Sequence, residues 1–159
     1  MPGDPRTFDI RSIQSTDKLN KFKLSRANDA LRAFLKKNAV SFQETDIAKT
    51  YVAVDSASEA SSVRAYITIA LSEIRKEYAE LDVPDAERYP HFPAVKIARL
   101  ATDVGFEGQG MGSSLIEFVV GLVTKQIMPF VGCRFLILDA NPEKIDFYKK
   151  RGFFLVDRI

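Results

Sequence analysis

The sequence predicts an α/β fold in a single domain, on the basis of its length, its hydrophobic patterns and its composition. The chain has 159 residues, enough for one domain with one substantial core. Segments rich in β-branched and aromatic residues recur along the chain, and stretches with helical hydrophobic spacing lie between them. An apolar fraction of 46% with 28% charged residues is typical of a globular protein.

The charge, cysteine content and hydropathy exclude several classes of protein. A formal net charge of +2 does not indicate a nucleic-acid-binding chain as a whole. Cys133 is the only cysteine, which excludes a disulfide framework and a structural zinc site, so no metal is expected. The chain lacks an apolar run long enough for a membrane span, and its start does not resemble a signal peptide. We therefore expect a cytoplasmic protein that does not bind a membrane.

The first third of the chain predicts one strand followed by one or two helices. Residues 8–13 partly alternate and suit a strand, and residues 15–17 offer N-cap side chains for the segment that follows. Apolar residues at helical spacing then continue to about Asn38. The exposed face of these helices carries a basic cluster: Lys18, Lys21, Lys23, Arg26, Arg32, Lys36 and Lys37.

The middle of the chain predicts three strands and one loop. Residues 50–54 and 64–71 are rich in β-branched and aromatic side chains and suit an antiparallel pair. Residues 75–93 are charged and proline-rich, which favours a loop with at most a short helix. Residues 94–100 suit a further strand, whose apolar side chains change phase before Leu100. A β-bulge would absorb this change of phase.

The last third predicts two helices and two short strands. Residues 115–123 are apolar almost all round, as in a helix buried against a sheet, and residues 135–138 suit a central strand. Asn141 and Pro142 are typical of a helix start, and a basic last turn before Gly152 is typical of its end. Residues 153–156 suit a final strand.

A glycine-rich turn between a strand ending near Thr102 and a helix starting near Met111 carries the clearest chemical signal. Its glycines permit positive φ angles and allow the backbone to approach a ligand closely. Backbone N–H groups at the positive end of the helix would then bind a phosphate or pyrophosphate. A Walker loop is excluded because Gly-Lys-Ser/Thr is absent, and a dinucleotide fingerprint fits poorly so late in the chain. The alternative is a glycine-rich connection that binds no ligand.

From Val95 to Phe154 the sequence resembles the Gcn5-related N-acetyltransferase (GNAT) superfamily. The resemblance rests on the strand 97–102, the turn 107–112, the apolar helix, the strand that ends at Asp139-Ala140-Asn141, and the block 147–153. It implies a mixed, mostly antiparallel central sheet that is splayed at a bulged strand and covered by helices on both faces. Too few residues follow Gly152 for the last C-terminal strand of that fold, so we expect that strand either to be missing or to be supplied by a partner.

The resemblance also implies acetyl-CoA as the acetyl donor. The family turn Gln/Arg-x-x-Gly-x-Gly/Ala falls on residues 107–112, with Glu107 in its first position. The backbone of residues 100–102 would run along the pantetheine arm, and Tyr148 would protonate the departing thiolate. The expected cofactor-binding residues are Leu100, Ala101, Thr102, Glu107, Gly108, Gln109, Gly110, Met111, Gly112, Ser113, Asn141 and Tyr148. The alternatives are a packing role for Tyr148 and a simple helix cap for Asn141.

No general base stands out in the sequence. Glu73, Glu77 and Glu107 are the nearest carboxylate candidates, and each also suits a solvated surface position, so water is the alternative base. His91 lies among prolines and suits a structural or substrate-rim role. Cys133 suits an inert buried thiol.

The N-terminal half is similar to the acetyltransferase toxins of toxin–antitoxin systems. The similar segments are residues 31–39, 49–54, 66–71 and 93–100. This resemblance implies acetylation of the amino group of aminoacyl-tRNA, with an antitoxin protein as partner. The basic cluster would contact RNA phosphates, or else be an ordinary solvated helix face. The alternatives are acetylation of a small amine, a peptide or a protein N-terminus, and a non-catalytic acetyl-CoA-binding regulatory module. An open sheet edge favours a homodimer.

Overall fold

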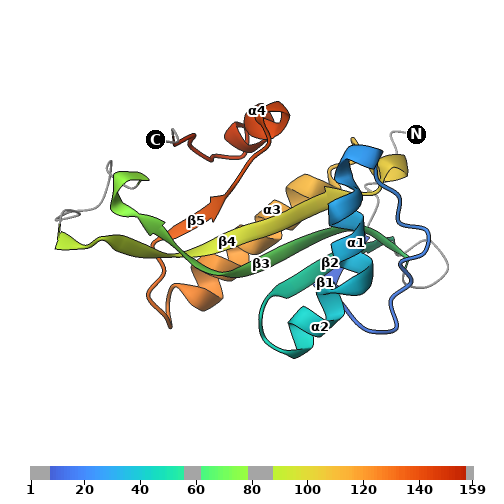
Figure 1. Ribbon diagram of the computed structural model, residues 1–159, viewed down its shortest axis with the longest axis horizontal. Helices are drawn as coiled ribbons and strands as arrows, with labels where there is room; N and C mark the ends of the chain where they lie inside the picture. The colour runs from blue at the N-terminus through green and yellow to red at the C-terminus, as the bar shows by residue number, and fades with distance from the viewer. Residues whose placement is uncertain (1–7, 56–61, 79–87, 157–159) are drawn as a thin grey trace. The chain divides into compact units, whose positions relative to one another are not determined.

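The computed structural model describes residues 8–55, 62–78 and 88–156, which contain both strands and helices (Figure 1). The strands are β1 (Phe8–Ser12), β2 (Lys49–Asp55), β3 (Val63–Arg75), β4 (His91–Thr102) and β5 (Phe135–Leu138). The α-helices are α1 (Asp29–Lys37), α2 (Ala39–Glu44), α3 (Met111–Leu122) and α4 (Ile145–Lys149). Short 3-10 or π turns cover Arg26–Asn28, Lys76–Tyr78, Val104–Phe106, Val123–Ile127 and Pro142–Lys144.

The five strands form one sheet in the order β1-β2-β3-β4-β5. Strands β1 and β2 pair antiparallel, as do β2 and β3, whereas β4 and β5 pair parallel over Ala94–Ile97 and Phe135–Leu138. This confirms the predicted mixed, mostly antiparallel sheet. The chain forms two compact units, residues 1–70 with 98–120 and residues 71–97 with 121–159. Strands β3 and β4 each run from one unit into the other.

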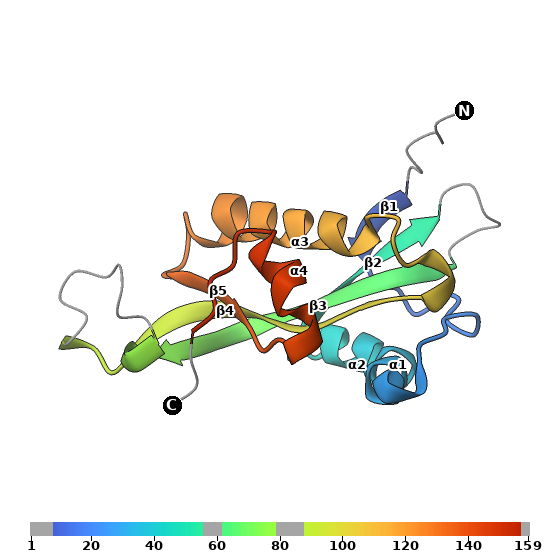
Figure 2. The same cartoon turned by 90° about the horizontal axis from the view of Figure 1, so that it is seen from above.

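In the first unit, helices cover both faces of β2 and β3 (Figure 2). Side chains alternate between the two faces of a strand, so Tyr51 and Val52 point to opposite sides. Tyr51 packs on Phe118 of α3 at a ring distance of 4.9 Å, whereas Val52 belongs to a core cluster that includes Phe34 of α1. Because both faces are covered, β3 is buried almost continuously from Val63 to Ile69.

The prediction of a helix directly after residues 15–17 is wrong. Residues 19–25 are irregular, and helical structure begins only at Arg26. The Asp17 carboxylate is used elsewhere: it accepts two hydrogen bonds from the Arg11 guanidinium, at 2.6 and 3.0 Å, and one from the Gln14 backbone N–H at 2.8 Å. It therefore closes a turn instead of capping a helix. Helix α1 ends before Asn38, where the sequence predicts the end of the helical region, whereas α2 follows Asn38 and lies beyond that predicted end.

Strand β4 is longer than predicted and begins inside the proline-rich segment. Pro93 is exposed within β4, and its carbonyl oxygen accepts a hydrogen bond from the Arg134 backbone N–H at 2.9 Å. Proline lacks the N–H donor but keeps its acceptor, so an exposed proline is compatible with a strand. The register with β5 is continuous over Ala94–Ile97, and the predicted bulge nearer Leu100 stays a prediction. The rest of the predicted loop falls partly on residues outside those described.

The C-terminal helix matches its sequence signals, but the strand after it does not form. Gly152 has φ +92° and its N–H donates to the Lys149 carbonyl oxygen at 3.0 Å, so it ends the helical segment as predicted. Residues 153–156 are irregular instead of a strand. Phe154 is 91% exposed, so its large apolar side chain does not pack on a sheet face.

Candidate active site

The glycine turn leads directly into the N-terminus of α3, as the sequence predicts. Gly108 and Gly110 have φ angles of +76° and +82°, which L side chains rarely adopt. The Ser114 N–H donates to the Gly110 carbonyl oxygen at 3.0 Å and is among the first bonds of the helix. Residues 107–110 are exposed, whereas Met111 is buried and anchors the helix start. The turn therefore presents backbone at the positive end of a 12-residue helix, an arrangement that binds phosphate groups.

Asp103 holds the turn in place, although the sequence reasoning did not single it out. Its carboxylate accepts a hydrogen bond from the Gly105 backbone N–H at 2.8 Å and another from the Lys23 backbone N–H at 3.0 Å. The side chain is buried, and the Val104 N–H donates to the Lys23 carbonyl oxygen at 2.9 Å. An aspartate two residues before a glycine is a known turn signal. This signal predicts the hydrogen bond to the Gly105 N–H but not the one to the Lys23 N–H.

The end of β4 continues past its pairing with β5. The paired residues stop at Ile97 of β4 and Leu138 of β5, and β4 runs on to Thr102. Ala101 is buried, while Leu100 and Thr102 are half-buried. The predicted pantetheine-binding residues therefore lie in the extended segment just before the turn, in the same unit as residues 107–113.

Asn141 lies in the second unit, at the start of the C-terminal helical segment. Its backbone is extended, with φ −62° and ψ 145°, and its carbonyl oxygen accepts a hydrogen bond from the Lys144 N–H at 2.8 Å. The side chain is exposed and makes no capping hydrogen bond. Asn141 thus occupies the predicted cap position, but its amide does not cap the helix.

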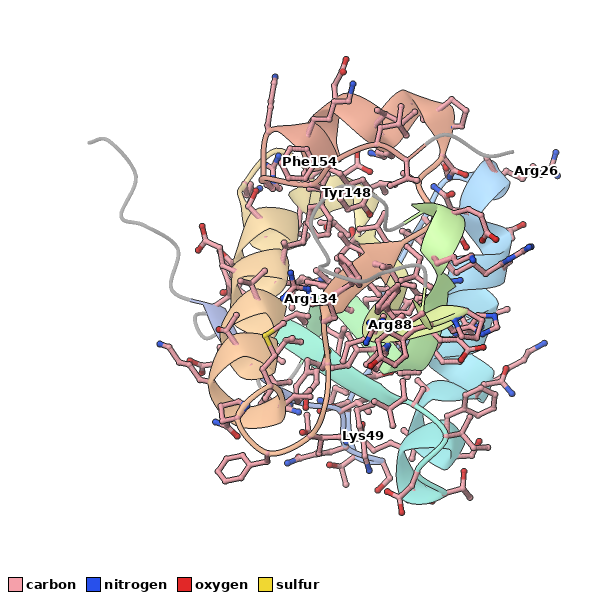
Figure 3. All side chains as sticks on the ribbon, turned by 90° about the vertical axis from the view of Figure 1, so that its left-hand side faces the viewer. Arg26, Lys49, Arg88, Arg134, Tyr148 and Phe154 are labelled. Carbon is pink, nitrogen blue, oxygen red and sulfur yellow. The ribbon has the colours of Figure 1, made fainter. Side chains whose placement is uncertain are left out.

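Tyr148 lies on α4 in the same unit, within a small aromatic cluster; Figure 3 labels it together with Phe154. Its ring meets those of Phe147 and Phe153 edge-on, with centroids 5.1 and 5.8 Å apart. Burial raises the pKa of the Tyr148 hydroxyl, and the nearby Arg151 charge opposes this shift more weakly. The phenol therefore stays protonated at neutral pH, as a proton donor requires.

The remaining candidates show no arrangement that assigns them a catalytic role. The Glu73 carboxylate lies 3.8 Å from the His91 imidazole, with both side chains well exposed, and Glu77 pairs with Arg75 at 3.4 Å. Glu107 is exposed in the turn. Cys133 is half-buried, and its thiol donates to the Phe135 carbonyl oxygen at 3.5 Å.

The structure contains neither a candidate metal site nor a membrane-spanning helix in the parts it describes. Within residues 8–55, 62–78 and 88–156, no group of three or more His, Cys, Asp or Glu side chains is arranged to hold a metal ion. In these same ranges, every helix is too short or too polar to cross a membrane.

Comparisons with known proteins agree with this geometry. Residues 77–153 match the model of the acetyltransferase (GNAT) family. The structure of AtaT complexed with acetyl-methionyl-tRNAfMet is similar at a TM-score of 0.81 and 23% identity, covering 96% of this chain and 89% of that one. A tyrosine-to-phenylalanine mutant of KacT is similar at a TM-score of 0.82 and 23% identity, covering 95% of this chain and 89% of that one.

A third structure has the same fold with two bound partners. The AtaT toxin with a tyrosine-to-phenylalanine mutation, bound to the C-terminus of the antitoxin AtaR and acetyl-CoA, is similar at a TM-score of 0.74 and 23% identity. The match covers 94% of this chain and 87% of that one. Residues 77–153 are thus similar to the acetyltransferase (GNAT) family, and the chain shares its fold with these acetyltransferase toxin structures.

Proposed function

We propose that this protein transfers the acetyl group of acetyl-CoA to the α-amine of an aminoacyl-tRNA in the cytoplasm. The observation that carries the proposal is the likeness to AtaT complexed with acetyl-methionyl-tRNAfMet, which covers 96% of this chain at a TM-score of 0.81. The family match accounts for acetyl transfer, and the likeness to this complex supports the choice of acceptor.

The glycine turn is the proposed site of the CoA pyrophosphate. Exposed backbone at residues 107–110 and the N-terminus of α3 supply amide donors and a positive dipole. Glu107 brings a negative charge into the turn, but the amide donors of the following residues do not depend on its side chain. Thr102 and the two residues before it supply the backbone edge for the pantetheine arm, and one of their N–H groups polarises the thioester carbonyl.

The transfer itself needs one base and one acid. The acceptor amine attacks the thioester carbonyl carbon, the new C–N bond forms and the C–S bond breaks. Water takes the proton that the amine loses, and Tyr148 donates a proton to the departing thiolate. The raised pKa of the Tyr148 hydroxyl supports this role because the proton is present at neutral pH. Asn141 helps to position the cofactor, since its side chain is not used in helix capping.

Two other functions predict different outcomes. An enzyme for small amines, peptides or protein N-termini would acetylate those acceptors in preference to charged tRNA. A regulatory module would bind acetyl-CoA without turnover. The basic cluster, whose side chains are exposed at Lys18, Lys21, Lys23, Arg26 and Arg32, supports an RNA acceptor.

Incubation with charged tRNA and labelled acetyl-CoA tests the acceptor. We expect label on the amino acid, and absence of label from every aminoacyl-tRNA would contradict the proposal. Tyr148→Phe should lower kcat by about 100-fold or more with little change in acetyl-CoA binding. Tyr89→Phe is the matched control, because Tyr89 is 56% exposed and its ring only meets Phe92 edge-on.

Two partners complete the proposal. An antitoxin is supported by the complex of the AtaT toxin with the C-terminus of AtaR, and co-purification of a co-expressed antitoxin would test it. A homodimer is supported by β5, which is the last strand in the sheet order and, among the described residues, pairs with β4 alone. The exposed side chains of Phe154 and Leu155 also support it. A solution mass of 17.8 kDa would contradict the dimer.

A further inference from the structure

Arg99 is a half-buried arginine in the final segment of β4, and we propose that it binds a phosphate of the acceptor RNA beside the transfer site. Its guanidinium stacks on the Phe34 ring at 3.6 Å from the centroid. Within the described parts of the chain, this guanidinium has no carboxylate partner and makes no hydrogen bond. The proposal rests on the proposed function, because it concerns the acceptor of that reaction.

The position of Arg99 places it next to the backbone that would hold the thioester. It directly precedes Leu100 and lies two residues before Ala101, so the Arg99 and Ala101 side chains share one face of β4. Ala101 belongs to the core cluster that contains Phe34 and Tyr66. Arg99 therefore points to the face covered by α1, the helix that carries part of the basic cluster.

The surroundings of Arg99 do not neutralise its charge. The nearby Tyr66 hydroxyl is already engaged, because it donates to the Leu31 carbonyl oxygen at 2.6 Å. Burial raises the pKa of Tyr66, so this phenol stays neutral and does not serve as an anionic partner. A half-buried charge without a counterion is unfavourable unless a ligand or solvent compensates it.

An aromatic-stacked guanidinium is well suited to a phosphate. Stacking on Phe34 fixes the plane of the group, and the N–H donors along its edge match two phosphate oxygens. In an aminoacyl-tRNA, the phosphate nearest the reacting amine is the one 5′ to the aminoacylated adenosine. Arg99 would therefore select a nucleotide-linked amine over a free small amine.

A pair of acceptors that differ by one nucleotide tests this directly. Puromycin carries the α-amine on a nucleoside without phosphate, and cytidylyl-puromycin adds a phosphodiester at the proposed position. The test variant is Arg99→Met, which keeps an unbranched side chain on Phe34 but removes the charge. We expect KM for cytidylyl-puromycin to rise about tenfold or more, with KM for puromycin changed less than twofold. Arg88→Met is the matched control, because Arg88 is exposed in the other unit.

Other outcomes would overturn the assignment. An equal loss on both acceptors would show a structural role, and an unchanged KM on both would show no role. If Arg99→Met does not fold, Arg99→Lys retains charge without the planar fork, and we expect it to show a smaller but still selective loss.

A binding assay separates this proposal from the proposed function. Fluorescence anisotropy with an uncharged RNA ending in CCA needs no turnover. The Arg99 proposal predicts about tenfold weaker binding for Arg99→Met than for the wild type, even if no aminoacyl-tRNA is acetylated. Equal affinities would overturn it.

Discussion

Substitution of Asp103 by Asn tests the link between the turn and the rest of its unit. The Asp103 carboxylate accepts one hydrogen bond from the Lys23 N–H and one from the Gly105 N–H. The amide of Asn can accept only one of them, and its NH2 group then faces the other backbone donor. Loss of one hydrogen bond to a charged acceptor at this buried position costs about 2–3 kcal/mol of unfolding free energy.

Urea denaturation measures this cost as a lower midpoint with an unchanged slope. The same change should lower Tm by about 4–12 °C for a chain of this size. Asp139→Asn is the matched control, since its carboxylate is 65% exposed and pairs with Lys96 at 2.8 Å, a surface pair that contributes about 1 kcal/mol or less. A free energy of unfolding for Asp103→Asn within about 0.5 kcal/mol of the wild type would contradict the role assigned to the Asp103 carboxylate.

Two other substitutions and one pH dependence probe the site and the core. Gly110→Ala should weaken acetyl-CoA binding about fivefold or more in calorimetry, because Ala is strained by about 1–2 kcal/mol at φ +82°. The control Gly132→Ala should bind acetyl-CoA as the wild type does. Thr50→Val leaves the buried Thr68 hydroxyl without its partner at 2.8 Å and should lower the free energy of unfolding by about 1–3 kcal/mol. The double change Thr50→Val with Thr68→Val should lower it by less than the single change. Additive losses in urea denaturation would contradict this expectation. The raised pKa of Tyr148 predicts that loss of its proton lowers kcat only above about pH 10, and a Tyr148-dependent decline near pH 8 would be inconsistent with an acid role.

The glycine turn and α3 could be predicted because their signals are local. These signals lie within a few residues of each other: a glycine that adopts positive φ, the residues that begin a helix, and the apolar spacing that buries one helix face. Gly108, Gly110 and Met111 occupy the places that the sequence indicates. Gly152 ends the C-terminal helix for the same reason.

The wrong predictions arose where tertiary contacts outweigh local pattern. Leu19 and Phe22 have helical spacing, but both lie in irregular backbone, where Phe22 is fully buried against Tyr66. A strand at 153–156 was expected from its apolar residues, but apolar residues favour a strand only where a neighbouring strand and a covered face exist. The Phe154 side chain is 91% exposed and therefore does not pack on a sheet face.

Arg99 and Asp103 show why the rest of the site could not be predicted from the sequence. In the sequence, Arg99 only interrupts the apolar alternation of the strand at residues 94–100. The fold places its guanidinium on Phe34, a residue of α1. Asp103 bonds to Lys23 across 80 positions of the chain, a separation that no local pattern encodes. The Lys23 N–H donates to the Asp103 carboxylate, and the Lys23 carbonyl oxygen accepts from the Val104 N–H, so residues 19–25 are fixed to the segment that leads into the glycine turn. A change at Asp103 should therefore weaken RNA binding and acetyl-CoA binding together, whereas a change at Arg99 should weaken only the former.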